Sequence, residues 1–340
     1  MKPTNQLFDI IKSLTPEEEK KFILLSSLQQ GDKNYIKLYN FIQKQDSYDE
    51  DAVKSHFKNE IFVQHFASEK NQLLHHILKS LRFHRQETSA SAKIDEEIKN
   101  IQLLFNKSLY KQSRKQLSII KKMAQDYELF YSLLEIVELE KVLIDMEAHF
   151  GDINYKTLDE LIEEENALFN KIENFAAYEL QLAKLNALSS RLMIARSKED
   201  VKEITDIIKE TNRFSDKEGF LSNKSKIIFL FIIGVANMLQ NEMNDVHKSF
   251  SELIIELENK PEIISEMPYY YIVSHGYLVR YCAIKKQYND GFKMIDKLKS
   301  LSLNEMFKAT DLQITIFTQS YITEMVLYSY IGQHDKATNV

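Results

Sequence analysis

Residues that interrupt helices are scarce in this chain of 340 residues, which holds seven glycines and four prolines. Average usage would be about 7% glycine and about 5% proline. A β-rich fold needs turn-forming residues at short intervals, whereas long helices need few of them. Because Leu, Lys, Glu, Ile and Gln dominate what remains, the composition predicts an all-α protein.

Cysteine and membrane-spanning runs are also lacking. The single cysteine, Cys282, excludes an internal disulfide framework and is expected to be a small buried hydrophobic residue. Charges at Asp9 and Lys12 leave no room for the apolar core of a secretory signal. The most apolar run, residues 227–236, is about half of the ~20 residues that a membrane-spanning helix needs. We therefore expect a buried helix there and a cytoplasmic protein.

Sequence signatures of catalysis are missing as well. Neither a glycine-rich phosphate loop nor a zinc-protease, serine-hydrolase or paired-cysteine motif can be written on this chain. Five histidines, His56, His65, His75, His76 and His84, cluster in the first segment. Their spacing does not supply ligands on one helix face. The sequence thus predicts no catalytic residues, no cofactor and no metal site.

The first 86 residues are predicted to be several short helices. Thr15, Pro16 and Glu18 form a capping-box pattern at a helix start. Residues 30–32 and 46–49 are expected to separate successive helices, and Ser68 is expected to cap a longer helix that ends near Gln86. The small polar stretch 87–92 is predicted to be a linker. This divides the chain into a helical domain at 1–86 and a second domain at 93–340.

The second domain shows a recurring pattern of helix and short break. Sharp elbows are predicted at intervals of 43 to 46 residues, at Tyr110, Asn154, Asp200, Met243, Tyr288 and His334. Seven residues after an elbow stand the apolar residues Leu117, Leu161, Ile207, Phe250 and Ile295. Three residues after it stand Ser113, Thr157, Glu203, Val246, Gly291 and Ala337, which are mostly small. A fixed period of this size predicts an α-solenoid of antiparallel helical hairpins, each about 45 residues long.

These positions resemble the tetratricopeptide repeat. The resemblance is carried by Tyr328, 332–334 and Ala337, by Gly234, 241–243, Val246 and Phe250, and by 286–288 and Gly291. The family's usual period is 34 residues, and this chain has no tryptophan. The resemblance therefore implies a tetratricopeptide-like superhelix with extended helices over residues 93–340, and it transfers no ligand-binding residues.

The last hairpin would be incomplete, since only six residues follow His334. Its first helix, from about 311 to 331, would keep an uncovered apolar face, whereas terminal repeats normally have a polar outer surface. On this ground we expect the sequence to be part of a longer protein.

Two sets of residues are candidates for binding. Tyr269, Tyr270, Tyr277 and Tyr281 follow Pro268 and suit an interface with a protein partner, although packing within a helix pair would also explain them. His75, Lys79, Arg82 and Arg85 lie on one region of a basic helix that could contact nucleic acid, although an ordinary solvated face has the same pattern.

The acidic run 159–165 stands early in a helix, where the helix dipole favours negative charge, and docking of a basic partner is the alternative interpretation.

The solenoid favours a non-enzymatic scaffold or adaptor that binds a protein or peptide on a concave face. The resemblance to tetratricopeptide repeats implies that the partner lies along first helices such as 176–195, 222–240 and 268–286. The alternative is a DNA-binding regulator with a repeat sensor domain. Net charge of −6 with interspersed signs provides no global field for nucleic acid or an anionic membrane. An enzyme is the third hypothesis, and it would need a pocket of converging polar side chains.

Overall fold

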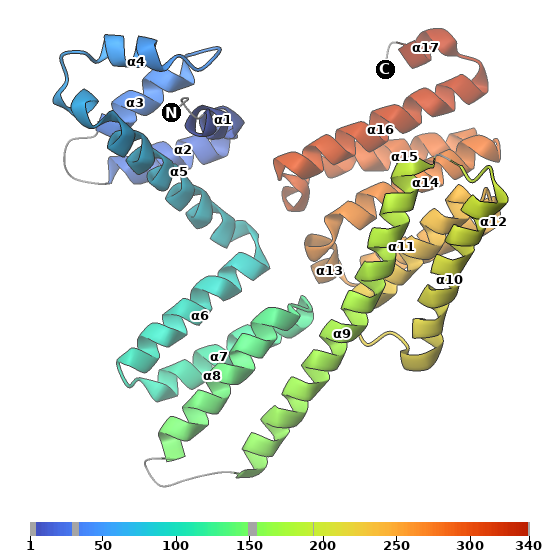
Figure 1. The fold of residues 1–340 in the computed structure, drawn as a ribbon, viewed down its shortest axis with the longest axis horizontal. Helices are drawn as coiled ribbons and strands as arrows, with labels where there is room; N and C mark the ends of the chain where they lie inside the picture. The colour runs from blue at the N-terminus through green and yellow to red at the C-terminus, as the bar shows by residue number, and fades with distance from the viewer. Residues whose placement is uncertain (1–4, 29–33, 149–154, 193, 339–340) are drawn as a thin grey trace. The chain divides into compact units, whose positions relative to one another are not determined.

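The computed structural model describes residues 5–28, 34–148, 155–192 and 194–338, and every regular element in these ranges is helical (Figure 1). The prediction of an all-α protein is confirmed for this part of the chain. Among the helices described, none has the length and apolar character needed to cross a membrane. The chain divides into two compact units, Met1–Lys93 and Ile94–Val340.

The first unit packs short helices around a small core. Its elements are α1 (Gln6–Ser13), α2 (Pro16–Ser27), α3 (Asn34–Gln43), α4 (Glu50–His56), the 3-10 helix η1 (Ile61–His65) and α5 (Phe66–Thr88). The core is formed by Phe22, Leu38, Tyr39, Ile42, Leu73 and Ile77. The predicted break at 46–49 lies between α3 and α4, and the one at 30–32 lies outside the described residues.

Helix starts in this unit follow local chemistry where a cap is present. The Thr15 side chain accepts from the Glu18 amide at 3.3 Å, and the Thr15 amide donates to the Glu18 carboxylate at 2.8 Å, so the predicted capping box is confirmed. The prediction for Ser68 is wrong, because η1 leads directly into α5 at Phe66. Within the predicted linker 87–92 only Ser89 is not helical, since α6 (Ala90–Asn106) begins immediately after it.

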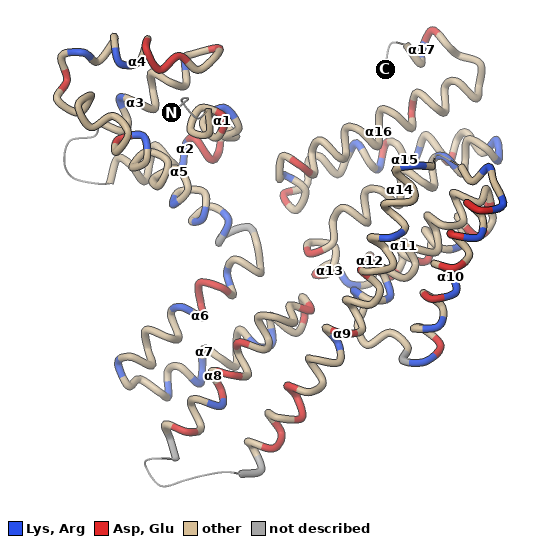
Figure 2. The backbone as a smooth tube through the Cα atoms, in the orientation of Figure 1, with Lys and Arg blue, Asp and Glu red and all other residues tan. Residues whose placement is uncertain are grey.

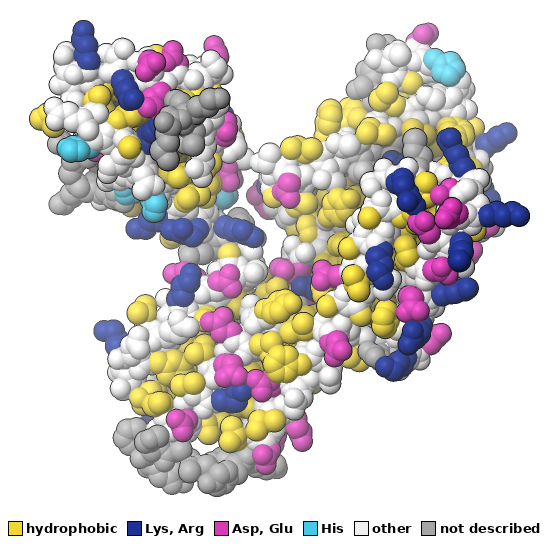
Figure 3. Space-filling view, viewed as in Figure 1, with side chains coloured by type: hydrophobic (Ala, Val, Ile, Leu, Met, Phe, Trp, Pro, Cys, Tyr) yellow, Lys and Arg dark blue, Asp and Glu magenta, His cyan; other side chains and the backbone are white. Residues whose placement is uncertain are grey.

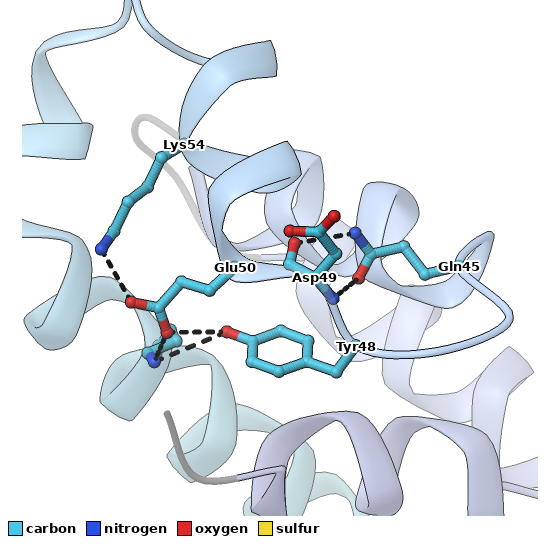
Figure 4. A network of polar contacts seen from close by, with 6 residues as sticks. Gln45, Tyr48, Asp49, Glu50 and Lys54 are labelled. Carbon is cyan, nitrogen blue, oxygen red and sulfur yellow. Dashed lines mark hydrogen bonds and ion pairs between the residues drawn. The ribbon is translucent and has the colours of Figure 1, made fainter. Parts of the chain in front are cut away.

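A polar network fixes the start of α4 (Figure 4). The Glu50 carboxylate accepts from the Tyr48 hydroxyl at 3.1 Å and pairs with Lys54 at 2.8 Å and Lys70 at 2.6 Å. Burial opposes ionisation, but the two ammonium groups lower the pKa of Glu50 to about 2. The ion pair between Glu50 and Lys70 ties α4 to α5.

The second unit continues from α6 with longer helices. They are α7 (Tyr110–Asp126), α8 (Phe130–Ala148), α9 (Tyr155–Arg191), α10 (Lys198–Glu218), α11 (Asn223–Leu239), α12 (Met243–Glu258), α13 (Pro261–Glu266), α14 (Pro268–Ile284), α15 (Tyr288–Leu301), the 3-10 helix η2 (Glu305–Phe307), α16 (Thr310–Ile331) and α17 (His334–Thr338). Helix α11 packs on α9 and α12, and α14 packs on α12, α15 and α16.

Close packing between α11 and α12 depends on a glycine. A Cβ atom built on Gly234 would lie 2.7 Å from Cζ of Phe250, whose ring is fully buried. The same ring stacks on Tyr277 of α14, with ring centroids 4.5 Å apart. Residues 227–236 are largely buried here, as expected, and Cys282 is buried as well.

Several elbows have the same backbone geometry. The residue two positions before the helix start has positive φ at Ser108, Asn241, Lys286 and Gly332. The following amide donates to the carbonyl five residues earlier, which is the Schellman pattern of a helix end. The starts of α7, α12, α15 and α17 coincide with four predicted elbows. The elbow at Asn154 lies outside the described residues, and Asp200 lies at the third position of α10, not at its start.

Helix α9 runs without a break for 37 residues, so the first helix expected at 176–195 does not begin as a separate element. The sequence between its two halves offers no glycine or proline that would end a helix. Figure 2 shows the acidic residues along its first half. Two of them already have partners: Glu164 pairs with Lys121 of α7 and Glu165 with Lys141 of α8, at 2.6 and 2.9 Å.

The turn between α7 and α8 also holds the start of α11. Glu128 has a φ of 48° and a carboxylate that accepts from the backbone amides of Asn223 and Lys224, both at 2.9 Å. A carboxylate is favoured at a helix N-terminus by the free amides and the helix dipole. This contact links segments that are about 95 residues apart in sequence.

Candidate partner-binding surface

The four candidate tyrosines differ in their exposure along α14. Tyr269 is 50% exposed, whereas Tyr270 and Tyr277 are partly buried against the main core of the unit. Tyr281 is also partly buried, and its ring lies 4.6 Å from that of His247 on α12. A packing role therefore accounts for much of Tyr270, Tyr277 and Tyr281, while Tyr269 presents its ring to solvent.

Three of these tyrosines belong to one aromatic cluster. The ring of Tyr269 lies 5.7 Å from that of Tyr270, which in turn lies 5.0 Å from Phe231 of α11. Tyr277 lies 6.3 Å from the same Phe231 ring. Edge-to-face and stacked pairs at these distances are favourable and fix ring positions. The helices α11 and α14 thus hold Tyr269 beside the packed rings of Tyr270 and Phe231.

Charged groups from two helices flank this cluster. Burial, and after it the negative charge of Glu179 on α9, raises the pKa of Tyr270 to about 12. Burial also raises the pKa of Glu179. The Arg280 guanidinium lies 5.4 Å from the ring centroid of Tyr277. We call Glu179, Tyr269, Tyr270, Tyr277 and Arg280 the tyrosine surface.

The chemistry of the tyrosine surface suits recognition. Its phenol groups can donate hydrogen bonds, Glu179 can accept them, and Arg280 can bind a carboxylate or a carbonyl. Glu179 and Arg280 escaped sequence reasoning, because about 100 residues separate them and neither stands in a motif. Helix packing brings Glu179 of α9 near Tyr270, whereas Arg280 lies one helical turn after Tyr277 on α14.

A second group of titratable residues lies next to this surface. The Tyr271 hydroxyl donates to Glu258 of α12 at 2.8 Å, and Lys297 of α15 donates to the same carboxylate at 2.6 Å. His275 is buried with its Nδ1 2.8 Å from the Tyr271 carbonyl, and burial lowers its pKa to about 4. These contacts join α12, α14 and α15. No sequence motif singles them out.

The basic candidates on α5 are all exposed. His75, Lys79, Arg82 and Arg85 lie along the second half of that helix, where Figure 2 shows basic residues. The His75 ring nitrogen Nδ1 lies 3.0 Å from the Asn71 carbonyl.

Two histidines of the first unit pack on aromatic rings. The His56 ring stacks on Phe41 and the His76 ring on Tyr35, each with centroids 4.4 Å apart. No three His, Cys, Asp or Glu side chains within the described ranges lie where they could hold a metal ion.

Known proteins add no further identification. Comparison of the chain with protein-family models, with curated proteins and with solved structures gives no match.

Proposed function

We propose that this protein is a non-enzymatic scaffold or adaptor that binds a protein or an extended peptide on the tyrosine surface. In this proposal the helix pairs of the second unit stack as a tetratricopeptide-like solenoid with a period of about 45 residues. The helices α9, α11, α14 and α16 are the first helices of successive pairs, and they line the concave face that receives the partner.

The observation that carries the proposal is the exposed ring of Tyr269 on α14, next to Tyr270, whose pKa is raised by burial and by the charge of Glu179 from the distant helix α9. Tyr269 keeps half of its surface in contact with solvent although it opens a helix whose other residues are largely buried. Tyrosine offers apolar area, a rigid ring and a hydrogen-bonding tip, and it is enriched in interfaces. The order of packing, α9 on α11 and α14 on α16, supports the stacked arrangement.

A selection from a displayed random peptide library tests the proposal with the full chain as bait. We expect enriched peptides to bind the parent chain at micromolar affinity in fluorescence anisotropy. Tyr269→Ala should weaken binding about tenfold, the loss expected for an aromatic anchor. Glu179→Lys should also weaken it, because it reverses the one carboxylate of the surface.

The matched control is Tyr131→Ala, since Tyr131 on α8 is 76% exposed and lies outside the tyrosine surface. It should bind the selected peptides like the parent. Absence of any enriched peptide, or equal losses in the Tyr269 and Tyr131 variants, would refute the proposed function.

A second candidate function is nucleic-acid binding by α5, and the exposure of His75, Lys79, Arg82 and Arg85 is what favours it. Lys79→Glu with Arg82→Glu should abolish DNA binding at low salt if α5 is the contact. Lys44→Glu with Lys58→Glu, two exposed lysines of the same unit, makes the same charge change elsewhere. This candidate is lost if the parent chain does not bind DNA at low salt.

A further inference from the structure

Helix α16 has two apolar faces. One face packs against the neighbouring helices and is formed by Leu312, Ile316, Ser320, Thr323 and Leu327. At about 100° per residue, the opposite face of the helix carries Ile314, Phe317, Tyr321, Ile322 and Met325. We call these five residues the α16 stripe. A helix in contact with solvent on one side normally has a polar outer face, so the α16 stripe needs a different explanation.

The α16 stripe is exposed and carries no charge. Ile314 and Phe317 are 60% and 61% exposed, and Ile322 and Met325 are 46% and 45% exposed. Tyr321 is partly buried, with its ring 4.4 Å from that of Phe317. Figure 3 shows hydrophobic side chains at the surface over α16.

Charge on α16 is confined to two residues, Asp311 and Glu324. Glu324 pairs with Lys299 of α15 at 2.6 Å, and its side chain is only 14% exposed. The exposed face therefore offers an apolar row about 16 Å long, from Ile314 to Met325.

We propose that the α16 stripe is the interface of a two-fold symmetric homodimer, in which α16 packs antiparallel on α16 of a second copy. With the two-fold axis between Gln319 and Ser320, Ile314 lies opposite Met325 of the second copy. Phe317 then lies opposite Ile322, and Thr318 opposite Tyr321. Each apolar residue of the α16 stripe thus meets an apolar or small residue, which is the self-complementarity that a two-fold interface requires.

Charges at the two ends fit the same register. Asp311 is exposed and falls opposite Tyr328 of the second copy. In each copy the Lys336 ammonium lies 5.8 Å from the Tyr328 ring centroid, and Lys336 is exposed. The antiparallel pair therefore brings Asp311 of one copy to Lys336 of the other, twice in each dimer. A parallel pair would instead bring like charges together.

The apolar area is sufficient for a specific, modest dimer. Partly exposed aliphatic and aromatic side chains contribute on the order of 100 Å² each, so the five residues bury on the order of 500 Å² per copy and about 1,000 Å² in the pair. This total lies at the lower limit of specific interfaces. A dissociation constant in the micromolar range is the expectation. The inference is independent of the tyrosine surface.

Sedimentation velocity of the full chain, from about 1 to 100 µM, tests the dimer. The parent should shift from monomer to dimer over this range. Phe317→Asp should raise the dissociation constant about tenfold or more, because it inserts a charge into the apolar row. Phe169→Asp is the matched control, since Phe169 on α9 is 52% exposed and should tolerate the change. Circular dichroism should show both variants folded.

Charge reversal tests the register itself. Asp311→Lys and Lys336→Asp should each weaken the dimer, and the two changes in one chain should restore it, because opposite charges face each other again. A parent that stays monomeric up to about 100 µM overturns the proposal. It is also overturned by a dimer that survives Phe317→Asp, by equal losses in both phenylalanine variants, or by a failed rescue.

Discussion

The packing of α11 on α12 makes a sharp prediction at Gly234, because two effects of opposite sign compete there. Replacing glycine by alanine inside a helix stabilises it by about 1 kcal/mol. The new methyl group of Gly234→Ala would lie 2.7 to 3.0 Å from three atoms of the Phe250 ring. The ring has little room to move, since it is fully buried and packs against the rings of Tyr277 and Phe231.

Overpacking of this kind costs about 1 to 3 kcal/mol. Gly234→Ala should therefore lower the free energy of unfolding by about 1 kcal/mol net, with a range of about 0 to 2 kcal/mol. In a chain that carries Phe250→Leu the clash is removed, and the same glycine replacement should become neutral or stabilising. This reversal of sign is the double-mutant signature of direct contact.

Gly276 provides the matched comparison. It also lies in a helix, α14, but a Cβ atom built on it would first meet the side-chain oxygen of Gln319 on α16. The amide end of Gln319 can rotate away, so Gly276→Ala should keep the helical gain and stabilise by up to about 1 kcal/mol.

Urea unfolding followed at 222 nm, with hydrogen exchange of peptides from α11 and α14, measures both variants. If Gly234→Ala stabilised the chain as much as Gly276→Ala, the close packing of Phe250 on Gly234 would be refuted.

Burial opposes ionisation of Glu50, but the ion pairs with Lys54 and Lys70 lower the pKa of this carboxylate to about 2. The stability they provide should be present above pH ~4.5 and be lost as the pH falls from there toward 2, and Glu50→Gln should flatten that part of a pH titration of the unfolding midpoint. Glu128→Ala removes the carboxylate that holds the start of α11, so it should destabilise the chain by about 1 to 3 kcal/mol and raise hydrogen exchange there, with a smaller effect for Glu128→Gln. Cys282 is 3% exposed and burial raises the pKa of its thiol, so it should not react with Ellman's reagent until the chain is unfolded by urea; rapid reaction of the native chain would contradict its placement.

Helix class and buried segments could be predicted from the sequence because they depend on local composition and periodicity. The residues seven positions after the elbows illustrate this, since Leu117, Leu161, Phe250 and Ile295 are buried and Ile207 is partly buried. The capping box at Thr15 was predictable for the same reason, because all of its groups lie within four residues. Ser68 was not, since the helix start there is set by the preceding 3-10 helix.

Helix ends were harder to predict, because glycine marks few of them. Ser108, Glu128, Asn241 and Lys286 adopt positive φ, and Gly332 is the glycine that does so at an equivalent end. A left-handed residue costs roughly 1 kcal/mol or more when it is not glycine. Packing of the helices on both sides of the turn offsets this cost. The conformational preferences of single residues do not reflect such packing, so they do not predict these helix ends.

Part of the tyrosine surface could be predicted from the sequence. Tyr269, Tyr270 and Tyr277 stand out by their clustering after Pro268, but the sequence could not separate the exposed ring from the two that pack. Glu179 was hidden because its approach to Tyr270 depends on the packing of helices that are about 90 residues apart in sequence. Contacts between residues that are far apart in sequence depend on the complete fold, and no local pattern reveals them.

A hydrogen-exchange footprint of a selected peptide on the full chain tests the scaffold proposal most directly. The peptide should protect segments of the second half of α9, of α11 and of the start of α14 together, and Tyr269→Ala should remove this protection. Protection confined to α5, or to α9 alone with α11 and α14 unchanged, would contradict a binding surface shared by these helices.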